Sequence, residues 1–95
     1  MDFQHFKNSL SHTSVPPSLT EGLQAMWYDA KGDWNKAHDI AQEIHSKEGS
    51  WIHAYLHRKE GDAGNAAYWY HRASQPVCKT SLAQEWEDIV KTLLT

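Results

Sequence analysis

The dipeptide Gly-Asp occurs twice in the chain, at Gly32-Asp33 and Gly61-Asp62, and the two copies are 29 residues apart. Glycine can end a helix in the left-handed conformation, and the aspartate after it can cap the next helix by accepting backbone N–H groups. The same offset also aligns small residues before and after the turn, Ala25 with Ala54 and Ala37 with Ala66. The sequence therefore predicts two helical hairpins, and a repeated hairpin that cannot bury its own apolar face must stack on a neighbour.

Glycine and proline divide the rest of the chain into short segments whose apolar residues recur at helical spacing. No segment alternates apolar and polar residues as a half-buried strand would, so we expect an all-α fold in one domain. Its predicted parts are a leader helix and linker at 1–17, a first hairpin at 18–48, a second hairpin at 50–75 and a capping helix at 81–95. The predicted helix starts are Ser18 (with Glu21 in a capping box), Asp33, Ser50, Asp62 and Ser81, and the predicted ends include Gly49 and Gly61.

The composition narrows the classes of function. A formal net charge of -3 argues against a nonspecific nucleic-acid binder, and one cysteine, Cys78, excludes an intramolecular disulfide and a multi-cysteine zinc site. There is no apolar run long enough for a membrane helix and no basic, apolar start typical of a secretory signal. We therefore expect a cytoplasmic protein with neither nucleic-acid nor membrane partners.

Each Gly-Asp turn belongs to a longer pattern. The first copy is Trp27–Ala37, and the second is Ala54–Asp62 followed by Ala66, Tyr70 and Ala73. This pattern resembles the middle of a tetratricopeptide repeat, and the run Ala67–Ala73 also resembles the related Sel-type repeats. The resemblance implies a right-handed array of antiparallel helical hairpins. The period of 29 residues is shorter than the family's ~34, and two copies are few for an array, so the last helix would serve as a cap.

The resemblance also implies a concave surface lined by the first helix of each hairpin, which here carries Trp51, Tyr55, Arg58, Lys59, Leu19, Met26 and Asp29. Aromatic side chains beside an arginine are typical of a peptide-binding groove. The function expected from such a surface is that of a noncatalytic protein- or peptide-interaction module, with an acidic or C-terminal peptide as ligand. The alternative is that Trp51 and Tyr55 pack on the first or last helix and fill the groove.

Two histidines, His53 and His57, are four residues apart on one predicted helix, the spacing that a helical metal site requires. A third ligand could come from His38, His45, His71, Glu43, Glu60 or Asp62. No glutamate follows His53 directly, so the metalloprotease signature is absent. In the resembled family an aromatic packs between helices at the position of His57, so the alternative to a metal-binding protein is a pair of packed or hydrogen-bonded histidines.

No motif for a catalytic triad, a phosphate loop or a nucleotide site occurs, so we expect neither an enzyme nor a cofactor. The carboxylates Glu85, Glu87 and Asp88 are expected on a solvated helix face. A third functional alternative is a self-associating structural protein, such as a homodimer paired through its end faces. With seven histidines, acidification is expected to destabilise the fold, because any buried neutral imidazole would have to become charged.

Overall fold

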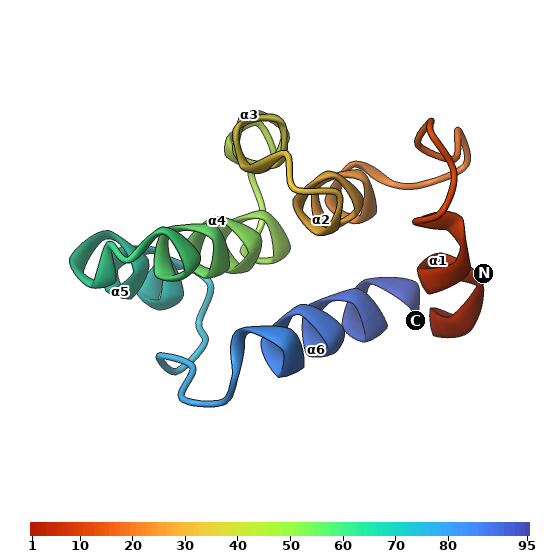
Figure 1. The fold of residues 1–95 in the computed structure, drawn as a ribbon. Coiled ribbons are helices and arrows are strands. Elements are labelled where there is room, and N and C mark those ends of the chain that lie inside the picture. The colour runs from red at the N-terminus through yellow and green to blue at the C-terminus, as the bar shows by residue number, and fades with distance from the viewer.

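Six α-helices and no strand make up the computed structural model, which describes residues 1–95 (Figure 1). The helices are α1 (Phe3–Ser9), α2 (Glu21–Ala30), α3 (Trp34–Gln42), α4 (Lys47–Glu60), α5 (Ala63–Arg72) and α6 (Leu82–Leu94). Helix α2 packs on α3 and α4 packs on α5, while α6 lies along α4 and α2 and contacts α1 (Figure 1). The all-α prediction is confirmed. None of the helices has both the length and the apolar character needed to span a membrane.

The two Gly-Asp turns have the same conformation. Gly32 and Gly61 have φ angles of +86° and +93°, in the left-handed region that glycine adopts without strain. In both turns the aspartate N–H donates to the carbonyl five residues earlier at 2.9 Å, and the aspartate side chain accepts the N–H three residues later. Asp33 and Asp62 are therefore the N-caps of α3 and α5, as the sequence predicts.

The predicted start of α2 at Ser18 is wrong. The N-cap is Thr20, whose hydroxyl accepts the Leu23 N–H at 3.4 Å. The Leu19 N–H donates to the carbonyl of Pro16, so the proline turn continues through Ser18 and the helix begins only after it.

The prediction that Gly49 separates two helices is also wrong. Helix α3 ends at Gln42, and α4 begins after Ser46, whose hydroxyl accepts the Gly49 N–H at 3.3 Å. Gly49 thus lies in the first turn of α4, so this helix starts before the predicted Ser50. A Cβ at Gly49 would overlap the carbonyl oxygen of Ile44 and lie 2.7 Å from its Cβ. The glycine is needed because the α3–α4 turn passes against the helix.

The main core lies between α2, α4 and α6, and α1 closes one end of it. Its fully buried side chains include Phe6, Met26, Ile52, Leu56, Ile89 and Val90. Trp86 of α6 packs against the rings of Phe3 and Phe6, and its indole N–H donates to the carbonyl of Met26 at 3.1 Å. The last helix therefore covers the surface that the first helices of the two hairpins share.

Candidate functional site

The residues of the predicted peptide groove are bonded to one another. Tyr55 is 2% exposed, and its hydroxyl donates to Asp29 at 2.8 Å. Lys59 forms an ion pair with the other oxygen of Asp29 at 2.9 Å, and Met26 is fully buried. Burial and the Asp29 carboxylate raise the pKa of Tyr55, so its hydroxyl stays a donor. These polar groups already have partners within the chain.

Glu85 of α6 occupies the other part of the predicted groove. It is 1% exposed, and it accepts hydrogen bonds from Trp51 at 3.2 Å, from Arg58 at 2.9 Å and from Tyr70 at 2.6 Å. The expectation that Glu85 faces solvent is therefore wrong. Because α6 sets this carboxylate against Trp51 and Arg58, the open groove expected over these residues is wrong as well.

A smaller hollow remains between α1, α2, α4 and α6, with a volume of about 410 Å³. We call it the α1–α6 recess. Asp29, Tyr55 and Lys59 of the predicted groove border it. Its apolar wall comes from the helices that cover the groove, through Phe3, Leu10, Leu82, Ala83 and Trp86.

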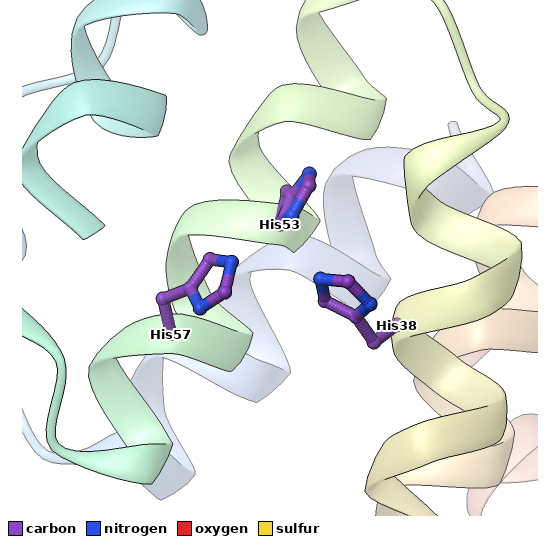
Figure 2. Close-up of side chains that lie close together, drawn as sticks. All are labelled: His38, His53 and His57. Carbon is purple, nitrogen blue, oxygen red and sulfur yellow. The ribbon is translucent and has the colours of Figure 1, made fainter. Parts of the chain in front are cut away.

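Three histidines from two helices form a second cluster of side chains. His53 and His57 are one turn apart on α4, and His38 reaches them from α3 (Figure 2). One nitrogen of each ring lies within 4.8 Å of the corresponding atoms of the other two. The ring centroids are 4.6 Å apart for His38 and His53, 5.2 Å for His38 and His57, and 4.8 Å for His53 and His57. We refer to these three residues as the histidine triad.

Of the six third ligands considered from the sequence, only His38 lies with both His53 and His57. Glu60 and Asp62 form a separate group with His57 at the exposed end of α4. His45, His71 and Glu43 belong to neither group.

Two tryptophans hold the triad in place. The indole N–H of Trp34 donates to the carbonyl of Leu56 at 2.9 Å, which fixes α3 against α4, and its ring stacks on His38 with 4.9 Å between centroids. Trp69 of α5 stacks on His53 at 3.9 Å. Sequence reasoning missed both tryptophans as parts of this site. The signal available was their position, since each lies in the helix that follows a Gly-Asp turn and packs on a histidine-bearing neighbour.

The three rings differ in their hydrogen bonds. His57 shares a hydrogen bond of 2.6 Å between its Nδ1 and the carboxylate of Glu60. No hydrogen bond reaches the ring of His38 or His53.

Burial, and after it the neighbouring imidazoles, lower the pKa of His53 to about 4. Burial, followed by the charge of His57, also lowers the pKa of His38. Both rings are therefore neutral at neutral pH, the form in which imidazole binds a metal.

Comparisons with family models, with curated proteins and with solved structures found no match to this chain. A function is therefore inferred from the geometry of the chain itself.

Proposed function

We propose that the protein binds a divalent transition-metal ion such as zinc through His38, His53 and His57. The observation that carries this proposal is the convergence of three imidazole nitrogens, all within 4.8 Å of one another, from helices on both sides of the α3–α4 turn. Two of these rings have no hydrogen-bond partner, although His53 is only 6% exposed. The ring nitrogens of His38 and His53 are therefore free to bind a ligand that the chain itself does not supply.

Metal binding requires the three rings to move closer together. Zinc binds histidine nitrogens at about 2.0–2.1 Å, which places tetrahedral ligands about 3.4 Å apart. The nitrogens of the triad lie within 4.8 Å of one another, so the imidazole rings would have to rotate and approach to bind one ion. Three protein ligands would leave the fourth position of a tetrahedral zinc for water or a small ligand.

The contact between His57 and Glu60 supports the same proposal. Histidines that bind metals usually donate a hydrogen bond from their second ring nitrogen to a carboxylate. This bond fixes the tautomer and orients the ring. In this chain Glu60 holds Nδ1 of His57 and leaves Nε2 for a metal.

Calorimetric titration of the chelator-treated protein with zinc chloride tests the proposal. We expect one equivalent to bind, and alanine variants at His38, His53 and His57 each to lose affinity by at least about tenfold. The matched control is His71→Ala, an exposed histidine on α5 outside the triad. Absence of heat with the unaltered protein, or equal losses in the control, would reject the metal site.

Noncatalytic binding of a protein or peptide is the second candidate function, and the α1–α6 recess favours it. The recess is mostly apolar, and the one cation there without an ion pair is Lys7, so the fitting segment carries an apolar side chain beside an acidic group. Peptides selected from a random library should bind the unaltered protein and fail to bind Ala83→Arg, which fills the recess. Ala67→Arg, an exposed alanine on α5, is the control, and equal binding by both variants would rule the recess out.

We further propose that the two hairpins are tetratricopeptide-like units in a right-handed array. The equal conformations of the Gly-Asp turns support this, as do Ala25 and Ala54, which are fully buried at corresponding positions. A crystal structure in which α2–α3 fails to superpose on α4–α5 would exclude it.

A further inference from the structure

A cavity of about 410 Å³ lies directly beside the histidine triad. The α3–α4 turn, the first turn of α4 and the outer end of α5 form its walls, and His53 and Trp69 separate it from the other two histidines. We refer to it as the α4 cavity. Its volume falls within the range of sites that bind small molecules, about 300–1,000 Å³.

The charges around the α4 cavity all have one sign. Lys47 and Arg72 border it, together with His45 and His53, and no aspartate or glutamate does. Neither Lys47 nor Arg72 forms an ion pair in the structure. This is a local excess of positive charge in a chain whose formal net charge is -3. An acidic ligand would therefore find two cations without ion pairs here, and the nearest acidic residue of α4, Glu48, lies outside the lining.

The backbone contributes in the same direction. Ser46, the N-cap of the 14-residue helix α4, borders the cavity, as do Lys47, Gly49 and Ser50 in the first turn after it. The backbone N–H groups of Lys47 and Glu48 donate no hydrogen bond, while that of Gly49 is held by Ser46. Free N–H groups at the positive end of a helix dipole bind anions.

His53 of the histidine triad also borders the cavity. The residue is 6% exposed, and its ring has no hydrogen-bond partner in the chain. Trp69 lies flat on the same ring, and the guanidinium of Arg72 lies 5.4 Å from the Trp69 ring centroid. The Trp69 indole thus lies between the guanidinium of Arg72 and the imidazole of His53, and it forms one wall of the cavity.

We propose that the α4 cavity binds a small oxyanion, the carboxylate or phosphate group of a small molecule. Lys47, Arg72 and the free N–H groups of the first α4 turn hold its charged oxygens, and His53 marks the deep end of the site. The guanidinium fork of Arg72 suits paired oxygens of either group. This site goes beyond the proposed metal binding, because the cations and N–H groups that form it are present without a metal.

The test is an amide chemical-shift titration of the metal-free protein by NMR, with inorganic phosphate and with acetate in separate arms. Sodium chloride at the same ionic strength is the reference. We expect saturable shifts at Lys47, Glu48 and Gly49 in at least one arm, and the arm with the tighter binding identifies the source of the oxyanion. Arg72→Gln and Lys47→Gln should each weaken that binding by about tenfold, within the range measured for charged hydrogen bonds.

The matched control is Lys79→Gln, which removes the same charge from an exposed loop outside the cavity. Shifts that sodium chloride reproduces, shifts equally weakened in this control, or no shifts at the α4 turn would each overturn the anion site. Zinc is absent from this titration and phosphate is absent from the zinc titration, so failure of one site is distinguishable from failure of the other.

Discussion

Trp69 lies flat on His53, with 3.9 Å between the ring centroids and 17° between the ring planes. Burial is the first cause of the lowered pKa of His53, and this indole supplies one face of that burial. Removing the indole in Trp69→Ala should let water reach the imidazole and raise its pKa from about 4 toward the ordinary 6.5. The measurement is an NMR titration of the His53 ring in metal-free protein. The neighbouring aromatic provides the control, since Tyr68 is exposed and Tyr68→Ala should leave the pKa low.

The same lowered pKa predicts a pH-dependent stability. His53 titrates at about 4 in the folded protein and near 6.5 when unfolded, so the unfolded state takes up the proton first as pH falls. The free energy of unfolding should therefore decrease from about pH 6.5 down to about pH 4, by as much as about 3 kcal/mol. Urea titrations of metal-free protein across this interval measure it. Because the pKa of His38 is lowered as well, His53→Gln should reduce the decrease without abolishing it, whereas His71→Gln should retain it in full. An equal slope in all three proteins would contradict the assignment.

The burial of the Glu85 carboxylate predicts that alanine substitutions at two positions of α6 will differ greatly in their effect on the free energy of unfolding. Glu85→Ala leaves Arg58 and Tyr70 without their partner and should cost about 3–5 kcal/mol in the free energy of unfolding. Glu87→Ala removes an exposed pair with Lys91 and should cost less than about 1 kcal/mol. Denaturant unfolding of both variants makes the comparison, and similar losses would mean that Glu85 does not fasten α6 to α4 and α5.

The close approach at Gly49 predicts opposite effects of alanine at two glycines. Gly49→Ala would force the α3–α4 turn away from α4, because the new Cβ overlaps the backbone of Ile44, and should cost about 1–3 kcal/mol. At Gly64 in α5 no atom lies within 4 Å of the point that a Cβ would occupy, so Gly64→Ala should stabilise the protein by up to about 1 kcal/mol. Thermal unfolding gives the sign of each change, and a neutral result at Gly49 would show that the turn yields easily.

The features that could be predicted from the sequence are those that depend on neighbours in the chain. The caps at Asp33, Asp62 and Ser81 and the helix end at Gly61 are all present, because each uses hydrogen bonds within a few residues. Gly49 misled the prediction, since a glycine required by a close contact has the same appearance in a sequence as one that ends a helix.

The candidate sites depend on how helices pack, and the sequence left them open. Glu85 lies outside the apolar stripe of its helix, where a residue is usually exposed to solvent. Only the docking of α6 over Arg58 and Trp51 buries it. The sequence shows that His53 and His57 are one helical turn apart, but it offers six candidates for the third metal ligand. The crossing of α3 over α4 selects His38 among them.

The most direct test of the metal proposal is anomalous diffraction at the zinc absorption edge from crystals of the zinc-loaded protein. The proposal predicts one strong peak, bonded to nitrogens of His38, His53 and His57 at about 2.0–2.1 Å. A map with no peak among these three rings, or with the zinc held only by exposed residues elsewhere, would contradict it.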